Sequence, residues 1–284
     1  MNTASKSLDG KVVMITGGGG GMGSCMALGL IGAGARVAAI DLNRDRLEKL
    51  AEKASQLGGE GCLLSLLADI TRVEECEKVI AEAMTKFGKI HALANNAGIG
   101  MQTIRANYMN EPVRFWEVDP ERWQRIMDVN WKGAFLMARS VAPHLIRQGS
   151  GRIINVTTSL DTMYRTCYTP YGMSKAALEA ATASWAKDLE NTGVTVNVLV
   201  PGGPTNTTFI PEAAPLDRKS LIQPQVMVAP ICWLVSDASE GFTGCRFVAS
   251  LWDTKVAPDE AAKKASSQAA WQQVTSKAVW PGAR

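Results

Sequence analysis

Residues 11–23 read KVVMITGGGGGMG, and this stretch decides the fold of the chain. An apolar run typical of a buried strand leads into five consecutive glycines, and residues 22–31 then have a helical pattern. Glycines between a strand and a helix permit a tight turn, and they let backbone amides approach a pyrophosphate at the helix N-terminus. The stretch fits both G-x-G-x-x-G and T-G-x-x-x-G-x-G, but five glycines satisfy many patterns. Its value as evidence therefore depends on the segments around it.

The second strand-like run, residues 36–40, ends at Asp41, eighteen residues after Gly23. A carboxylate at this place can accept hydrogen bonds from both ribose hydroxyls of an adenosine, and it would repel the 2′-phosphate of NADP. Arg44 lies nearby in the sequence and would weaken that repulsion. In the alternative reading, Asp41 or Asn43 caps the following helix, but the glycine turn upstream favours the cofactor. The sequence therefore predicts NAD in preference to NADP.

A second acidic residue, Asp69, stands before Ile70 and after the third strand-like run, residues 62–67. Its side chain could contact the adenine, or it could cap the helix that begins near Arg72, and the sequence favours neither reading. We include Asp69 and Ile70 among the expected cofactor contacts.

Strand-like and helical segments alternate along the chain. The strand-like runs are 11–16, 36–40, 62–67, 90–94, 152–156, 194–200 and 245–251, and the helical segments are 22–31, 44–57, 73–87, 120–148, 170–191 and 225–236. Alternation at this spacing predicts parallel strands joined by right-handed crossovers. We expect an α/β fold: a doubly wound, seven-stranded parallel sheet in a single Rossmann-type domain over residues 1–252. Ala and Lys at helical spacing predict a helical tail over 253–284.

Two long, irregular stretches, residues 99–119 and 202–224, each follow the end of a predicted strand. Ligands of open α/β sheets bind outside the carboxyl ends of the strands, so both stretches are candidate substrate loops. Simple surface insertions are the alternative. Within the first loop, Tyr108 and Trp116 are candidates for apolar contact with a substrate.

Tyr171 and Lys175 are four residues apart in a helical segment and so share one face. The spacing alone is common by chance. Here it falls at the start of the helix after the fifth strand. A nearby ammonium favours the phenolate of a tyrosine and lowers its pKa. Such a pair can take a proton from an alcohol while a hydride leaves for the cofactor.

With these motifs together the chain resembles the classical short-chain dehydrogenase/reductases over residues 8–244. The resemblance rests on five motifs in order, which are T-G-x-x-x-G-x-G at 16–23, N-N-A-G at 95–98, Asn130 in V-N-x-K-G, Y-x-x-x-K at 171–175, and Pro201-Gly202. One motif alone would be weak, whereas five in the same order are highly specific.

The resemblance implies a role for each matching residue. Tyr171 would be the general acid/base, Lys175 would lower its pKa and bind the nicotinamide ribose, and Asn130 would hold a water that relays protons to Lys175. The segment at 95–98 would line the adenosine side and steady the sheet, and Thr205 would bond the carboxamide beside Pro201. The expected cofactor contacts are Gly17, Gly21, Met22, Gly23, Asp41, Asp69, Ile70, Asn96, Gly98, Lys175, Pro201, Gly202 and Thr205.

One departure concerns the hydroxyl that works beside the tyrosine. The family carries a serine thirteen residues before the tyrosine, where this chain has Thr158, and Ser159 follows. Neighbours on a strand face opposite sides, so only one of the two should point into the site. Counting from Tyr171 favours Thr158, and a bulge after residue 156 would favour Ser159 instead. The expected substrate contacts are therefore Thr158, Ser159, Met163 and Tyr171.

The second departure is at the C-terminus. Where the family has a glycine turn after the last strand, residues 249–252 read ASLW, and a further tail follows. The resemblance implies that the last strand lies at a subunit interface. The tail could then wrap a partner subunit, cover the active site or be a frayed appendage.

Composition excludes several other classes. The net charge is +3 with scattered Lys and Arg, so no nucleic-acid groove is expected. Two histidines and no C-x-x-C pair make a metal site improbable, and six cysteines in a chain of this length are read as reduced thiols. Neither a signal peptide nor a membrane span is evident. We expect a cytoplasmic homo-oligomer, a dimer or homotetramer, that binds a small-molecule substrate.

Three functions remain. The leading one is an oxidoreductase that transfers a hydride between NAD and a moderately apolar secondary alcohol or ketone. The second is an NADP-dependent carbonyl reductase. The third is a non-catalytic dinucleotide sensor, which the missing serine and the unusual tail favour, whereas the intact set of Tyr171, Lys175 and Asn130 argues for catalysis.

Overall fold

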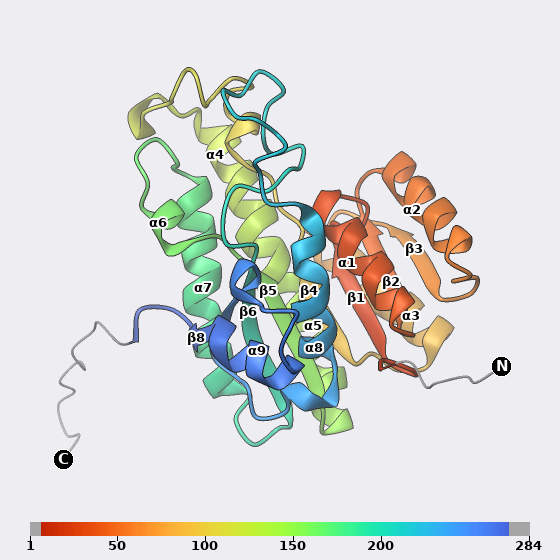
Figure 1. Ribbon diagram of the computed structural model, residues 1–284. Helices are drawn as coiled ribbons and strands as arrows, with labels where there is room; N and C mark the ends of the chain where they lie inside the picture. Colours follow the sequence, from red (N-terminus) through yellow and green to blue (C-terminus); the bar gives the residue numbers. More distant parts are fainter. Residues whose placement is uncertain (1–6, 273–284) are drawn as a thin grey trace, which may run out of the picture.

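A central sheet with strand order β3-β2-β1-β4-β5-β6-β7-β8 runs through the computed structural model, which describes residues 7–272 (Figure 1). The strands are β1 (Val12–Thr16), β2 (Arg36–Asp41), β3 (Leu63–Leu67), β4 (Ala92–Asn95), β5 (Gly151–Val156), β6 (Val194–Val200), β7 (Cys245–Val248) and β8 (Ser266–Gln268). β1 to β7 pair in parallel, and every residue of β1 and β6 is buried, as expected of strands covered on both faces. The doubly wound parallel sheet expected from the sequence is confirmed.

The sheet has one strand more than the seven we expected, and that strand is antiparallel. β8 comes from the C-terminal tail and pairs with β7, with Ser267 opposite Arg246. Pairing covers the backbone groups that β7 would otherwise leave open at the edge of the sheet. The tail is therefore helical only in part, at α9 (Pro258–Ala265), before it becomes β8. Both elements pack on the chain's own sheet, and residues 273–284 of the tail lie outside the described part.

The helices are α1 (Gly21–Gly32), α2 (Arg44–Gln56), α3 (Val73–Phe87), α4 (Pro120–Met127), α5 (Gly133–Gln148), α6 (Leu160–Met163), α7 (Tyr171–Asp188) and α8 (Val228–Val235), besides α9. α4 begins with Asp119 as its N-cap and Pro120 in its first turn, a favourable start. The single helix predicted over 120–148 is continuous, but a π-helical segment, Asp128–Lys132, joins α4 to α5. A wider turn of this kind is frequent at functional sites, and Asn130 lies within it.

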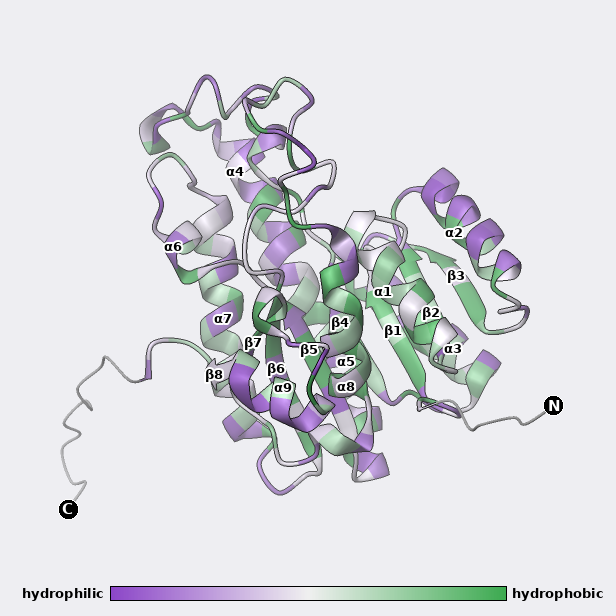
Figure 2. Ribbon diagram, viewed as in Figure 1, coloured by the Kyte–Doolittle hydropathy of each residue, from purple (hydrophilic) through white to green (hydrophobic). Residues whose placement is uncertain are grey.

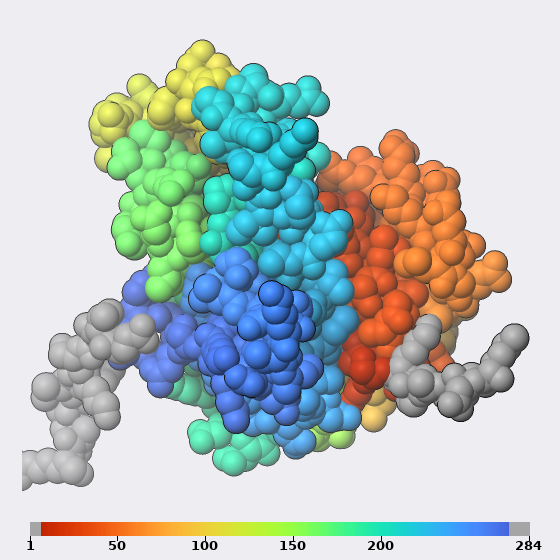
Figure 3. Space-filling view, viewed as in Figure 1, coloured from red at the N-terminus to blue at the C-terminus, as the bar shows by residue number. Residues whose placement is uncertain are grey.

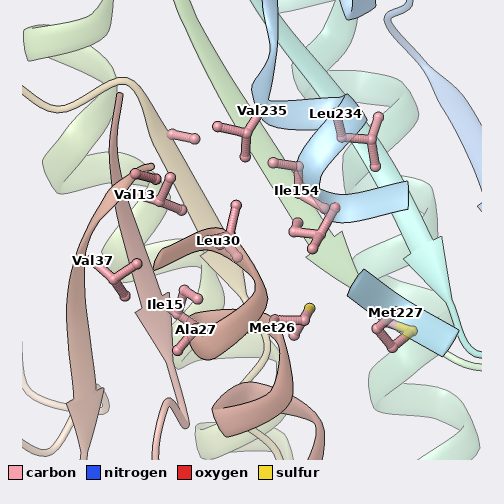
Figure 4. Close-up of a cluster of buried hydrophobic side chains, with 14 of the residues drawn as sticks. Val13, Ile15, Met26, Ala27, Leu30, Val37, Ile154, Met227, Leu234 and Val235 are labelled. Atoms are coloured by element: carbon pink, nitrogen blue, oxygen red, sulfur yellow. The ribbon is translucent and has the colours of Figure 1, made fainter. Parts of the chain in front are cut away.

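Two apolar clusters fill the space between the sheet and its helices. On one face, Met26 and Leu30 of α1 pack with Ile231 of α8 against β1, β2 and β5 (Figure 4). On the other, Val79 of α3 and Val141 of α5 pack with residues of α7. Strands β1 and β2 are strongly hydrophobic, whereas α2 is mostly polar (Figure 2). Helices therefore cover both faces of the sheet, as in other doubly wound folds.

The strand order reverses between β1 and β4, which lie side by side in the middle of the sheet. This is the switch point at which open α/β sheets bind ligands, outside the carboxyl ends of the strands. The loop after β4, the segment with α6 after β5, and the loop after β6 gather at this same end (Figure 1). The first and last of these lie against each other (Figure 3), joined by a hydrogen bond from Asn110 to the carbonyl of Ala213.

Candidate active site

The glycine turn between β1 and α1 brings backbone amides to the switch point. Gly17 has φ of +64°, and a Cβ there would lie 2.9 Å from the Cα of Ala97. A Cβ at Gly23 would lie 2.0 Å from the carbonyl oxygen of Gly17, so glycine permits the close approach of turn and helix. α1 has no side-chain N-cap and no acidic residue in its first turn. The N–H groups of a first helical turn have no intrahelical acceptor, so they suit an anion such as a pyrophosphate.

Asp41 is tied to this turn at the end of β2. Its Oδ2 accepts a hydrogen bond from the Gly19 amide at 3.0 Å, and its Oδ1 accepts one from the Asn43 amide at 3.0 Å. The N-cap of α2 is Asn43, whose side chain accepts from the Arg46 amide. The structure thus separates the two roles that the sequence left open: Asn43 caps the helix, and Asp41 faces the cleft.

A cleft of about 380 Å³ runs from Asp41 across the glycine turn. Nine of the expected cofactor contacts line it, namely Gly17, Gly21, Met22, Gly23, Asp41, Asp69, Ile70, Asn96 and Gly98. Asp69 accepts hydrogen bonds from both the amide and the hydroxyl of Thr71, and its Oδ2 lies 3.8 Å from Arg125. A glycine cradle, a helix N-terminus and a carboxylate at the end of β2 together fit a dinucleotide.

The N-N-A-G segment holds β1 and β4 together below the cleft. The Asn96 amide group donates to the carbonyls of Thr16 and Gly17, and the hydroxyl of Thr16 accepts from the Asn96 and Ala97 amides. Asn95, the neighbour, donates to Oδ1 of Asn155 on β5 at 2.9 Å. These bonds fix the turn at Gly17 relative to the sheet.

A second cavity, of about 180 Å³, adjoins the cleft, and the two share Met22, Thr207 and Phe209 in their walls. Both loops predicted to contact substrate contribute to its lining, as do six expected site residues, Met22, Thr158, Ser159, Tyr171, Pro201 and Thr205. Tyr108 of the first loop lines it as well, whereas Trp116 is 69% exposed and stacks edge-on with Phe115.

Tyr171 begins α7, and its side chain lines the second cavity together with Thr158, whose side chain is close enough to affect the Tyr171 pKa. Burial raises the pKa of Tyr171 to about 12, and the side chain of Thr158 acts in the opposite direction. Ser159 has a different task, because it caps α6 by accepting from the Thr162 amide and pairs with the Thr162 hydroxyl at 2.7 Å. The structure therefore brings Thr158, not Ser159, to Tyr171.

Lys175 lies one turn along α7 and is buried, with 3% of its surface exposed. Burial lowers its pKa to about 8, and its Nζ donates to the carbonyl of Val156 at 2.9 Å. We expected Lys175 to lower the pKa of Tyr171, but burial raises that pKa in this structure, and the opposing contribution comes from Thr158. The ammonium is aimed at the end of β5, directly behind the cavity.

Asn130 connects the π-helical segment to this centre without lining either cavity. Its Oδ1 accepts from the Ile99 amide at 2.8 Å, and its Nδ2 donates to the Ile99 carbonyl and to Oγ of Ser174. A Cβ at Gly98 would lie 3.3 Å from Oδ1 of Asn130 and 3.4 Å from Nζ of Lys175. The structure thus places Asn130, Gly98 and Lys175 together.

Two expected site residues lie elsewhere. Met163, expected at the substrate, is buried at the end of α6, where its carbonyl oxygen approaches Gly172 of α7, and it lines neither cavity. Gly202 also lines neither, since it turns the chain after β6 with φ of +101° against Ser250. Thr205 does line the second cavity, and its hydroxyl donates to the Gly203 carbonyl.

Sequence reasoning missed several cavity residues. Thr207 and Phe209 stand where the cleft and the second cavity meet, and Phe209 packs edge-on against Tyr171 with ring centroids 6.3 Å apart. Arg46 lines the cleft close to Gly19. The loop 202–224 was expected to carry such contacts, but no local pattern singles out residues within an irregular loop.

Within residues 7–272, no helix is both long and apolar enough to cross a membrane. The same part of the chain contains no group of three or more His, Cys, Asp or Glu side chains that could hold a metal ion.

A sequence profile of the short chain dehydrogenase family matches residues 11–215. A 3-oxoacyl-[acyl-carrier-protein] reductase of Thermotoga maritima is 32% identical over 84% of this chain and 95% of its own. A 2-dehydro-3-deoxy-D-gluconate 5-dehydrogenase of Escherichia coli is 32% identical over 84% and 93%.

Two solved structures are similar as well. A 3-ketoacyl-(acyl-carrier-protein) reductase from Brucella melitensis, complexed with NADH, has a TM-score of 0.70 at 28% identity, covering 84% of this chain and 95% of that one. An NAD+-bound xylitol dehydrogenase has a TM-score of 0.73 at 26% identity, covering 84% and 96%.

Proposed function

The chain belongs to the short-chain dehydrogenase family of NAD(P)-dependent oxidoreductases, and we propose that it transfers a hydride between NAD and a moderately apolar secondary alcohol or ketone. The observation that carries this proposal is that Tyr171 and Thr158 line one cavity, which adjoins the cleft of the glycine turn. Relatives that act on acyl-carrier-protein thioesters and on sugar acids support the reaction class and leave the substrate open.

The residues of the cleft fit a dinucleotide. The amides at the start of α1 would hold its pyrophosphate, Asp41 its adenosine ribose, and Pro201 and Thr205 would border its nicotinamide end. When bound, the cofactor would accept or deliver the hydride.

The proton moves through the chain's own residues. In the direction of reduction, the phenol of Tyr171 donates its proton to the substrate oxygen, and its raised pKa keeps it protonated until that step. Thr158 donates a hydrogen bond to the same oxygen. Lys175, whose pKa of about 8 leaves it mostly charged at pH 7, favours the phenolate that results. In oxidation the same groups act in reverse.

Replacing Tyr171 with phenylalanine tests this assignment. We expect kcat to fall by about 10²–10⁴-fold, the usual contribution of a positioned acid or base, while NADH still binds, as its fluorescence would report. The substrate panel should include secondary alcohols, sugars, steroids and hydroxyacyl thioesters. Turnover of none of them by the wild-type protein, with NADH bound, would favour a non-catalytic sensor.

One observation favours NADP as an alternative cofactor. Arg46 lines the cleft beside Gly19, whose amide donates to the carboxylate of Asp41. A guanidinium there could donate hydrogen bonds to a 2′-phosphate. Asp41 itself is bonded into the turn and cannot swing away without losing two hydrogen bonds. We therefore propose NAD as the cofactor. Initial rates measured with NADH and with NADPH test this choice.

We also propose that the outer face of α5 and α7 joins subunits in a homo-oligomer. An apolar hollow there is lined by Phe135, Ala142, Ile146 and Trp185, and Phe135 and Ile146 are 41% and 44% exposed. Exposed apolar patches on folded chains often mark interfaces. Light scattering gives the mass in solution, and a monomer would refute the proposal. The homotetramer and the cytoplasmic location remain predictions from the sequence.

A further inference from the structure

An ion pair is buried behind the second cavity. Glu179 of α7 and Arg246 of β7 are 2.6 Å apart between Oε2 and Nη1, with side chains 0% and 6% exposed. Neither residue lines the cleft or the cavity. Charges removed from water in this way are costly unless their remaining hydrogen-bonding groups are satisfied. The partners of this pair therefore show what it holds in place.

Those partners are Thr157 and Thr158, and Thr158 carries the hydroxyl that we place beside Tyr171. Nη2 of Arg246 donates to the carbonyl of Thr158 at 2.6 Å, and the hydroxyl of Thr157 donates to Oε2 of Glu179 at 2.8 Å. The ladder between β5 and β6 ends at Val156, so Thr158 lies beyond the strand's own hydrogen bonds. After Val156 the hydrogen bonds from Arg246 and to Glu179 hold the chain in place of the sheet pairing.

The C-terminal tail completes the arrangement. The amide of Ala270 donates to Oε1 of Glu179 at 3.2 Å, and Ser267 of β8 pairs with Arg246 itself. Ala269, between them in sequence, is wholly buried. Both carboxylate oxygens of Glu179 thus have donors, and the tail shields the pair from water.

We propose that Arg246 and Glu179 are positioning residues that set the hydroxyl of Thr158 against Tyr171; the inference rests on the function proposed above. A threonine side chain is stiff about χ1 because its Cβ is branched. Its hydroxyl therefore cannot adjust by rotation when the backbone moves, as a serine hydroxyl can. Arg246 fixes that backbone by its hydrogen bond to the Thr158 carbonyl. A threonine needs this support because its side chain does not compensate for a backbone shift.

The test is a double-mutant cycle between Arg246→Met and Thr158→Ser. Arg246→Met should lower kcat by at least about tenfold with little change in KM for NADH, because a misplaced group costs rate before it costs binding. In the Thr158→Ser background the same change should cost clearly less, since serine can readjust. Equal losses in both backgrounds would overturn the proposal, because independent effects add in free energy.

Two further variants separate positioning from folding. Arg152→Met removes another buried arginine, which bonds Ser239 at the far end of β5, and it should cost the same factor in both backgrounds. Glu179→Gln combined with Arg246→Met leaves no unpaired buried charge, so it keeps the test open if the single variant fails to fold. That double variant should show the same dependence on Thr158.

A readout without turnover keeps this test apart from that of the function. The chain has four tyrosines, so the ¹³Cζ resonance of Tyr171 can be assigned with Tyr171→Phe. We expect Arg246→Met to shift this resonance because the position of Thr158 relative to the Tyr171 hydroxyl changes. Arg152→Met should leave the resonance in place. An unmoved resonance in Arg246→Met refutes the positioning role, whereas absence of turnover in the wild-type protein refutes only the function.

Discussion

Replacing Asp41 with asparagine is expected to shift the cofactor preference from NAD toward NADP. The carboxylate is 8% exposed and held by the amides of Gly19 and Asn43, so it cannot turn away from an approaching phosphate. At a separation of about 5 Å and an effective dielectric constant of about 20, two unit charges repel by roughly 3 kcal/mol, on the order of 100-fold. Screening by salt at the open cleft reduces this value. We therefore expect the ratio of kcat/KM for NADPH to that for NADH to rise by about 10- to 100-fold.

The same substitution has a structural cost that must be measured beside the kinetics. Asp41 serves the two amides through separate oxygens, and asparagine would replace one of these acceptors with an NH2 donor. The unpaired amide should lower the free energy of unfolding by about 1–3 kcal/mol. Urea denaturation measures this loss and shows whether the variant is folded under assay conditions.

Asp45→Asn is the matched control for charge. Asp45 lies in the first turn of α2, is exposed and does not line the cleft. Its removal changes the net charge equally but should leave the cofactor ratio nearly unchanged. A preference of the wild-type protein for NADPH would contradict the role of Asp41. So would a change in the NADPH-to-NADH ratio of kcat/KM that is no larger in Asp41→Asn than in Asp45→Asn.

Thr158→Ala should lower kcat by about 10²-fold, as for loss of one donor to the reacting oxygen. Ser159→Ala should keep kcat and lose only the N-cap of α6, so the free energy of unfolding measured with urea should fall by about 1 kcal/mol. Equal losses of kcat in the two variants would contradict the assignment of Thr158. Burial lowers the pKa of His91 to about 4, and its Nδ1 accepts from the Val12 amide. Between pH 6.5 and 4 the unfolded chain binds a proton there that the folded chain does not, so the free energy of unfolding should fall as pH falls. In His91→Gln the free energy of unfolding should lack this pH-dependent contribution. Identical pH profiles of the free energy of unfolding for the wild-type protein and His91→Gln would refute the assignment to His91.

The order of strands and helices could be predicted from the sequence because it depends on local periodicity. The buried run before the glycines, the spacing of Tyr171 and Lys175, and the acid at the end of β2 all involve residues close together in the chain. The antiparallel β8 could not be predicted in this way. Three residues, Ser266–Gln268, carry no strand pattern of their own, and they become a strand because β7 offers an open edge.

The choice between Thr158 and Ser159 shows the same limit at the site. Alternation along a strand predicted that only one of the two faces inward, but β5 ends at Val156 and both residues line the second cavity. The difference between them depends on α6, whose start takes Ser159 as its cap. The position of Met163 likewise follows from the packing of α6 on α7.

By itself the sequence determined the parallel α/β fold, and it located the glycine turn and the Tyr171–Lys175 spacing, because each depends on residues close together in the chain. The tertiary structure alone decided which hydroxyl meets Tyr171 and what holds it there. Glu179 and Arg246 are 67 residues apart, and nothing in either local sequence signals the other. Only the packing of α7 on the sheet, where β7 lies beside β6, brings the two charges together, and the cost of burying either one alone makes the pairing specific.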